Sequence, residues 1–234
     1  MKRLGIVFVS LLSVFVFAVN ASAQGDTSGL YVGLLGGFSF PPALSTTLTD
    51  QSDGENDKGD INMKTGWLAG AKVGYLTPFT GRIIAAELEY NHLESNYDNT
   101  KQYAGGTIDG GMKADVLMVN LIGRYPGGRW HPYVGVGGGY ANVKVNDISG
   151  WAQNAKIMTI QGGSQGVFAY QFLAGVDFDI TRNWMVGLGY KYLASSSMSF
   201  NTTASAADGS ASIPVNVDTT YKSHNLVLTV GYNF

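Results

Sequence analysis

The sequence contains no cysteine, so no disulfide can supply the rigidity that small exported domains often take from such bonds. Charged residues make up only 14% of the 234 residues, against roughly a quarter in ordinary soluble domains. The net charge of −2 gives no reason to expect a nucleic-acid partner. Only one long apolar run is present, at the N-terminus, so membrane-spanning helices are excluded elsewhere in the chain.

The N-terminal apolar run has the pattern of a secretory signal peptide. Lys2 and Arg3 precede the apolar residues 4–19, and the small-residue triplet Ala21-Ser22-Ala23 follows. A membrane anchor is the alternative, but the run is shorter than the roughly 20 residues of a spanning helix. We expect residues 1–23 to be a signal peptide cleaved after Ala23, and residues 24–234 to form one exported domain.

Large apolar residues recur at every second position in eight segments of the remaining chain. In the last segment, Leu226, Leu228 and Val230 alternate with residues that are small or polar with one exception. A period of two is typical of a strand whose two faces meet different surroundings. The segments are residues 30–40, 64–76, 82–93, 113–125, 130–144, 167–180, 184–194 and 224–234.

The connections between these segments alternate between short and long. Residues 77–81, 126–131 and 181–183 are short turns rich in Pro, Gly and Asn. The long connections, which are unusual in compact domains, cover about residues 41–63, 94–112, 145–166 and 195–221. Short turns at one end and long loops at the other predict an all-β protein, an eight-stranded antiparallel up-and-down transmembrane β-barrel with four long extracellular loops.

A water-soluble barrel of the lipocalin type is the alternative architecture, and it differs in which face points inward. The small and polar face is mostly Gly and Asn with a few charges, which suits a narrow interior better than a solvated exterior. Aromatic residues near the strand ends fit the girdles of a membrane barrel. They are Trp67, Tyr75, Tyr125, Trp130, Tyr140, Tyr170, Trp184, Tyr192, Tyr232 and Phe234.

The inward face carries three charges of each sign, and buried charges are tolerated when they are paired. We expect a structural network that fills the lumen, with Lys72 facing Glu87 across the 77–81 turn. An ion-selective lining is the alternative interpretation of the same residues. The predicted members are Lys72, Glu87, Glu89, Asn120, Arg124, Asp177 and Lys191.

The chain resembles the eight-stranded outer-membrane proteins of the OmpA/OmpX-like and opacity-type surface antigen group. The resemblance covers residues 24–234 and is carried by "GLYVGLLGGFSF", "AAELEY", "HPYVGVGGGYA", "FAYQFLAGVDFDIT", "WMVGLGYKYL" and "LTVGYNF". It implies a surface antigen, an adhesin or an envelope-stabilising protein located in the outer membrane. We expect a monomer without a cofactor, in contact with outer-membrane lipid and lipopolysaccharide.

The resemblance extends to the last strand. Phe234, with Tyr232 two residues before it, is similar to the sequence that the barrel-assembly machinery recognises in this group. OmpA itself continues into a soluble peptidoglycan-binding domain, whereas this sequence ends at Phe234. We therefore expect no peptidoglycan anchoring by that route.

Some outer-membrane barrels modify lipid A, and such chemistry needs a nucleophile within hydrogen-bond reach of a base. His92 with Ser95, and His224 with Ser223, are the neighbours near the predicted rim. Adjacent residues of a strand face opposite sides, and many serines make such neighbours common by chance. We expect no enzyme activity and no catalytic residues.

The first long loop contains the acidic stretch "DQSDGENDKGD", from Asp50 to Asp60. Carboxylates two residues apart suit calcium, but the stretch lacks the glycine order of an EF-hand loop. A solvated acidic loop is the interpretation we favour, and we expect no metal site.

The third long loop carries apolar residues that would be unusual in free solvent. Trp151, Ile157, Met158 and Ile160 either extend the strands above the membrane or form a contact patch. Because loops on a rigid scaffold commonly carry recognition, we expect a structural or surface-interaction protein whose loops meet an extracellular ligand or a host surface. A narrow pore of low conductance is the alternative.

Overall fold

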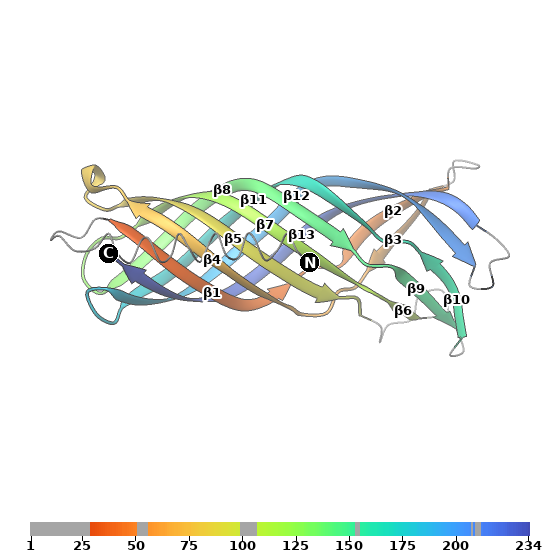
Figure 1. Cartoon of the computed structure of the whole chain (residues 1–234), viewed down its shortest axis with the longest axis horizontal. Helices are drawn as coiled ribbons and strands as arrows, with labels where there is room; N and C mark the ends of the chain where they lie inside the picture. Colours follow the sequence, from red (N-terminus) through yellow and green to blue (C-terminus); the bar gives the residue numbers. More distant parts are fainter. Residues whose placement is uncertain (1–28, 51–55, 99–106, 153–154, 207, 209–211) are drawn as a thin grey trace, which may run out of the picture.

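Eight long strands dominate the computed structural model, which describes residues 29–50, 56–98, 107–152, 155–206, 208 and 212–234. They run side by side at a steep tilt, and consecutive long strands are antiparallel (Figure 1). The eight strands are β1 (Leu30–Phe40), β4 (Gly66–Leu76), β5 (Ile84–Asn96), β7 (Gly111–Arg124), β8 (Trp130–Val145), β11 (Gly163–Asp179), β12 (Trp184–Ala206) and β13 (Ser212–Asn233).

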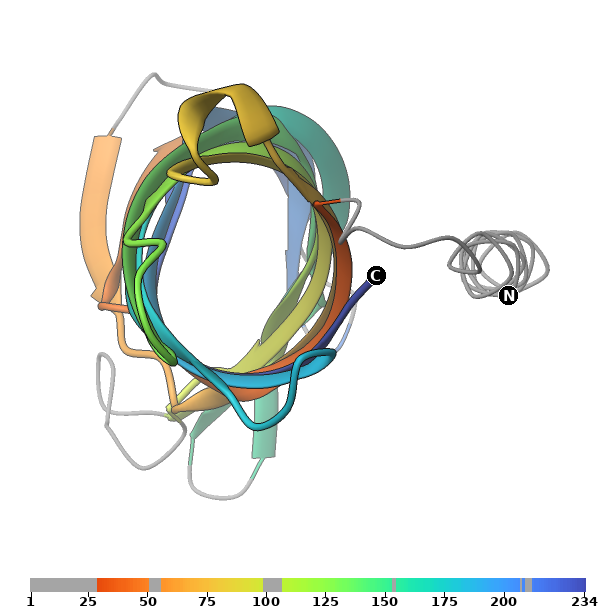
Figure 2. The same ribbon diagram turned by 90° about the vertical axis from the view of Figure 1, so that its left-hand side faces the viewer.

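The sheet closes on itself, which leaves no open edge between the first and the last long strand. β13 pairs with β12 on one side and with β1 on the other, from Tyr31↔Asn233 to Phe40↔His224. Seen from one end, the strands form a ring (Figure 2). The predicted eight-stranded antiparallel barrel is therefore confirmed. No helix in the described ranges is long and apolar enough to cross a membrane.

The outer face of the barrel is apolar, as the alternation predicts. Leu34, Leu121 and Leu228 are more than half exposed, and each neighbours a buried residue on its strand. Such residues are favourable on an exterior that faces lipid. Aromatic side chains ring both ends of this band, with Tyr125, Trp130 and Trp184 at the end of the short turns, and Trp67, Tyr140 and Tyr190 at the other.

The end with the short connections is compact. The turn between β4 and β5 contains the single-turn helix η1 (Pro78–Thr80), and Gly81 follows it with φ 65°, a left-handed conformation that glycine adopts without strain. Hydroxyls tie this turn together, since Thr77 Oγ1 donates to Ile84 O at 2.8 Å. The short turns thus lie at one end of the barrel, and the long connections lie at the other end.

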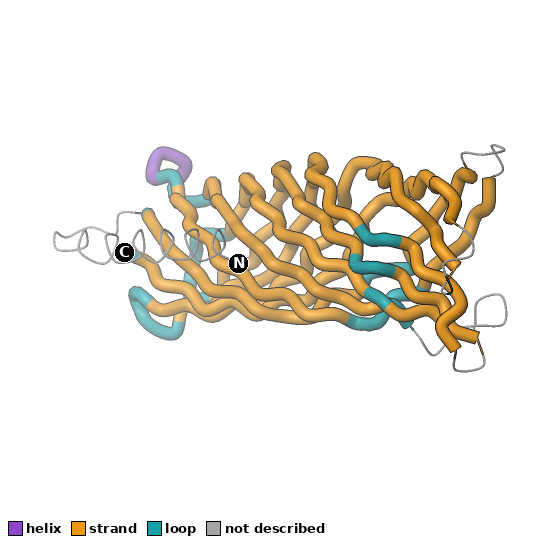
Figure 3. The backbone as a smooth tube through the Cα atoms, turned by 45° about the vertical axis from the view of Figure 1, so that its right-hand side comes forward, coloured by secondary structure: helices purple, strands orange, loops and turns teal. Residues whose placement is uncertain are grey.

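The described parts of the long connections, which were predicted as loops, are mostly strand. Their described parts form β2 (Leu44–Asp50), β3 (Asn56–Ile61), β6 (Thr107–Asp109), β9 (Ile148–Ala152) and β10 (Ala155–Ile160). The last two barrel strands also run well past the expected ends at residues 194 and 224. Figure 3 shows strand continuing to the far end of the molecule. Thr and Val in these segments have a high strand propensity, and Ser tolerates a solvated strand.

Candidate functional site

A layer of polar side chains, called the polar layer below, crosses the lumen at mid-height. Lys72 Nζ on β4 lies 2.8 Å from Glu87 Oε1 on β5. The same oxygen accepts a 2.6 Å hydrogen bond from the Tyr31 hydroxyl on β1. Tyr31 and Lys72 both donate to Glu87, and these hydrogen bonds hold its buried carboxylate in the lumen.

Glu89 is the centre of the second half of the polar layer. Its Oε2 receives Lys191 Nζ from across the barrel at 2.6 Å. Its Oε1 accepts from Asn91 Nδ2 at 2.6 Å and from Gln171 Nε2 at 3.3 Å. Gln171 also donates to Asn120 Oδ1 at 2.7 Å, which joins β7 to the same group. Each oxygen of this buried carboxylate thus has a donor, as a buried charge requires.

Glycines on neighbouring strands make room for these side chains. A Cβ atom on Gly74 would collide with the ring of Tyr31, and one on Gly137 would collide with Asn120 Oδ1. In a barrel this narrow, a large inward side chain fits only where the residue beside it is small. The many inward glycines therefore serve the packing of the polar layer.

The predicted network differs in one part from the observed contacts. Arg124 and Asp177 were both predicted as members of the network. Arg124 Nη2 lies 3.9 Å from Asp179 Oδ1, and Asp177 is buried. Asp179 Oδ2 lies 2.8 Å from His131 Nε2, and His131 Nδ1 lies 2.9 Å from the carbonyl oxygen of Tyr125. This cluster sits at the end of the short turns, at the termini of β7, β8 and β11.

Five polar partners were missed by sequence reasoning. The alternation places each of them on the inward face, but only the register shows which charge each one meets. They are Tyr31, Asn91, Gln171, His131 and Asp179.

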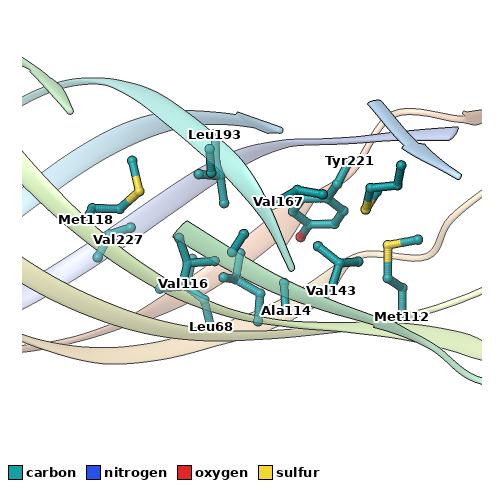
Figure 4. Close-up of a cluster of buried hydrophobic side chains, with 14 of the residues drawn as sticks. Leu68, Met112, Ala114, Val116, Met118, Val143, Val167, Leu193, Tyr221 and Val227 are labelled. Carbon is teal, nitrogen blue, oxygen red and sulfur yellow. The ribbon is translucent and has the colours of Figure 1, made fainter. Parts of the chain in front are cut away.

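Beyond the polar layer, toward the end of the long connections, the lumen is filled by apolar side chains. All eight barrel strands contribute to this cluster, which we call the apolar plug (Figure 4). Val116, Met118 and Val143 at its centre have no exposed surface. The expectation of an interior made of small and polar residues is therefore wrong for this half. The plug comprises Leu35, Leu68, Leu93, Met112, Ala114, Val116, Met118, Ala141, Val143, Val167, Ala169, Leu193, Met198, Tyr221 and Val227.

Above the plug the same sheet continues beyond the closed barrel, and we call this part of it the distal sheet. Its order is β3, β2, β13, β12, β10, β9 and β6. β12 and β13 pair from Trp184↔Tyr232 to Ser205↔Ser212, with a register shift between Ala194 and Ser197. β12 has 23 residues, and because a barrel strand needs about 9 to 11 to cross a membrane, about half of it projects beyond the apolar band.

Polar side chains link the strands of the distal sheet. Thr202 Oγ1 on β12 donates to the carbonyl oxygen of Gln161 at 2.7 Å. Gln165 Oε1 on β11 accepts from the backbone N–H of Ser199 at 3.1 Å. Asn216 Nδ2 on β13 donates to Asn201 Oδ1 at 3.1 Å. The first bond joins β12 to the connection after β10, and the other two join neighbouring strands, so the distal sheet is an ordered extension of the barrel wall.

Comparison with known proteins assigns the chain to a family. The family model of the outer membrane protein beta-barrel domain matches residues 9–234. The chain is an outer-membrane β-barrel protein. No curated protein matches the sequence.

Solved structures of outer-membrane proteins are similar to this chain at low sequence identity, and OprG shares its fold. The outer membrane protein OprG from Pseudomonas aeruginosa is 15% identical, with a TM-score of 0.59 over 90% of this chain and 98% of that one. Neisserial surface protein A is 15% identical, with a TM-score of 0.49 over 90% of this chain and 100% of that one. The attachment invasion locus protein Ail of Yersinia pestis is also 15% identical, with a TM-score of 0.39 over 87% and 98%.

The two expected His–Ser neighbours are not brought together in this outer-membrane barrel. His92 points outward and its Nδ1 lies 2.8 Å from Asp115 Oδ1, whereas Ser95 is buried in the lumen. His224 also points outward, with Nδ1 2.7 Å from the Tyr190 hydroxyl, whereas Ser223 is fully buried. Neither pair forms the nucleophile–base contact that hydrolysis needs.

The predicted loop patch lies on the β9–β10 hairpin of the distal sheet. Trp151 is partly exposed and pairs in register with Lys156. Ile160 pairs in register with Ile148 and with Ala204 of β12. The backbone of Ile157 and Met158 belongs to β10, and their side chains lie outside the described part of the structure. The strand extension that the sequence left open is thus observed, and the contact patch stays a prediction.

The acidic stretch of the first long loop lies partly outside the described residues, which omit 51–55. Among the residues that are described, no group of three His, Asp or Glu side chains could hold a metal ion. The predicted signal peptide, residues 1–23, also lies outside the described residues.

The last strand ends in a cluster of aromatic rings that pack edge to face. The ring centroid of Tyr232 lies 5.2 Å from that of Trp184 and 5.0 Å from that of Phe234. The backbone N–H of Phe234 donates to the carbonyl oxygen of Leu30 at 3.0 Å. Phe234 is buried at 9% exposure, so it closes the seam between the first and last strands.

Proposed function

We propose that this outer-membrane barrel is a non-conducting surface protein, an antigen or adhesin-like scaffold that presents the distal sheet to extracellular partners. One observation carries the proposal: the lumen is filled by the apolar plug, while the strands above the plug continue outward as an ordered sheet. The long connections form an ordered exterior surface, and the lumen is not an open channel. This arrangement fits recognition better than transport.

The apolar plug argues against the alternative of a narrow pore. Side chains from all eight strands meet in the lumen, and Val116 and Met118 have no contact with solvent. An ion that crossed this layer would lose its hydration shell without gaining a polar partner, which costs many kcal/mol. The charged residues below the plug then act as structural pairs and not as a selectivity lining.

The distal sheet supports recognition because its strands are fixed relative to the membrane. Inter-strand hydrogen bonds hold β10, β12 and β13 in register. A preorganised surface loses less conformational entropy on binding than free loops do. Trp151, with its partly exposed ring, is the side chain of the predicted loop patch that we propose as a contact.

The same proposal includes the route to the membrane. We propose cleavage after Ala23, contact with lipid and lipopolysaccharide along the outer face, and Tyr232 with Phe234 as the feature that the assembly machinery reads. Mass spectrometry of the protein from outer membranes checks the first point, with Gln24 as the expected N-terminal residue. Removal of Phe234 should slow the appearance of the heat-modifiable folded form, and an unchanged rate would contradict its role in assembly.

Two measurements test the proposed function. In planar bilayers the purified barrel should show no stable single-channel conductance, and a stable conductance would favour the pore. Epithelial surface proteins should be retained by the intact barrel and lost when residues 41–63 are replaced by a short glycine-containing turn. A matched variant with residues 146–162 replaced in the same way shows whether the β2–β3 hairpin or the β9–β10 hairpin binds the surface proteins. Equal retention by the intact barrel and by both variants would contradict recognition through the distal sheet.

A further inference from the structure

The barrel wall has a break where the first strand leaves the membrane. Pairing of β1 with β13 ends at Phe40↔His224, and pairing of β2 with β13 begins at Thr46↔Thr219. Residues 41–45 and 220–223 lie between these two registers and belong to neither. Pro41 and Pro42 occupy the start of the gap, and proline cannot donate a ladder hydrogen bond.

A pocket of about 70 Å³ lies at this break. Its lining mixes both faces of the wall, since Tyr221 and Met112 are buried in the lumen whereas Lys222 is exposed on the outside. Tyr221 and Met112 lie at the same end of the apolar plug (Figure 4). The pocket therefore sits within the wall, between the outer surface and the end of the plug.

The lining combines apolar side chains with hydroxyl groups and one cationic side chain, Lys222. Met63, Met112 and Pro41 supply aliphatic and thioether surface, and methionine adapts readily to flat or irregular ligands. Lys222 lies at the outer edge, and within the described part of the chain it forms no ion pair. An uncharged ligand would form no ion pair with this ammonium, whereas a ligand with a carboxylate would.

The volume limits the apolar part of a ligand. Room for one water corresponds to about 10–15 Å³ on the same measure. A pocket of about 70 Å³ therefore holds roughly five to seven atoms of the size of a water oxygen, which is the size of one six-membered ring. A long acyl chain does not fit without displacing the plug.

Accessibility follows from the position of the pocket along the strand. His224 borders the gap, two residues from Lys222 on the outer face, and its ring contacts those of Tyr190 and Tyr192 in the outer aromatic girdle. Lys222 lies above that girdle, at the level of the lipid headgroups and the external medium. A small solute can reach it without crossing the hydrocarbon layer.

We propose that this wall pocket binds a small aromatic carboxylate. The ring lies against Met63 and Met112 between the two registers, and the carboxylate pairs with the Lys222 ammonium, with the Thr220 hydroxyl beside it. The site lies in the wall below β2, and part of its lining, Pro41 to Ala43 and Met63, belongs to the same long connection as β2 and β3.

Methyl-labelled methionine gives a direct test, because the chain has only seven methionines and two of them line the pocket. The full barrel in lipid nanodiscs is titrated with benzoate and followed by NMR of the methionine methyl groups. The signals of Met63 and Met112 should shift in a saturable way, and those of Met118 and Met185 should not. Benzyl alcohol should shift the same signals at higher concentration, and acetate should shift neither.

Variants test the role of the Lys222 charge and of the pocket volume. Lys222→Gln should weaken benzoate about fivefold and leave benzyl alcohol unchanged, whereas Lys144→Gln, at an exposed lysine outside the pocket, should change neither. Ala43→Phe should fill the pocket from its exposed side and abolish the shifts, with heat-modifiability showing that the barrel still folds. The proposal is overturned if Met63 and Met112 do not respond, if all methionines respond alike, or if Lys222→Gln and Lys144→Gln behave the same.

Discussion

The polar layer and the apolar plug share one lumen and the same eight strands, but they fill it with opposite chemistry. In the polar layer, Glu87 and Glu89 each bind a lysine and further donors, and glycines provide the space. In the plug, packing alone holds the side chains, and Val116, Met118 and Val143 touch no solvent. The difference predicts that the polar layer tolerates loss of a charge poorly, while the plug is sensitive to loss of volume.

The largest effect is expected in the polar layer. Glu89→Gln leaves the buried Lys191 ammonium without its counter-charge, and breaking a buried pair in this way costs about 3–5 kcal/mol of the free energy of unfolding. The double variant Glu89→Gln with Lys191→Met should recover at least half of the loss, because no buried charge is left alone. Urea unfolding in lipid vesicles, followed by tryptophan fluorescence, measures both.

A matched control for this prediction lies on the outer surface. Glu94 Oε1 is 2.9 Å from Lys113 Nζ, but the two side chains are 29% and 39% exposed. Glu94→Gln should therefore cost no more than about 1 kcal/mol. If the two glutamate variants were equally destabilised, burial would not be what makes the Glu89 pair important.

An intermediate effect is expected in the plug. Leu193→Ala removes a side chain that is 4% exposed among the plug residues. The cavity should lower the free energy of unfolding by about 2–3 kcal/mol, at the lower end of the usual range because neighbouring methionines can partly refill the space. The same substitution at Leu188, which is 48% exposed on the same strand, leaves a gap that lipid fills and should cost clearly less. Equal losses at the two positions, measured by the same urea method, would mean that the plug is no tighter than the lipid contact.

These comparisons show why some of the structure could be predicted from the sequence and some could not. The outer face was predictable because Leu117, Val119 and Leu121 alternate with inward residues and lie against lipid. The plug was not, because Val116 and Met118 put apolar residues on the inward face of the same strand, and alternation cannot separate two apolar faces. The strands of the distal sheet lack a clear alternation of apolar and polar residues, so the sequence left strand extension open only for the third long loop.

The ion pairs of the polar layer show a further limit. Lys72 stands opposite Glu89 in the backbone register, yet its ammonium binds Glu87, two residues away. The predicted pairing of Lys72 with Glu87 matches this contact, but the choice between the two glutamates is decided by Lys191, which reaches Glu89 from across the barrel. Contacts across a lumen depend on barrel diameter and shear, which no short stretch of sequence encodes.

The smallest effect is expected from a single hydroxyl in the polar layer. Tyr31→Phe removes the 2.6 Å hydrogen bond to Glu87 Oε1 and leaves Lys72 in place, so the charge stays paired. The free energy of unfolding should fall by about 1.5 kcal/mol, the lower end for a hydrogen bond to a charged group. Tyr190→Phe, which removes a 2.7 Å hydrogen bond to His224 on the outer face, should change it by less than about 0.5 kcal/mol, as for most surface substitutions. A loss at Tyr31 as small as that at Tyr190 would show that Lys72 alone satisfies Glu87, and the polar layer would then depend on its two lysines more than on the donors around them.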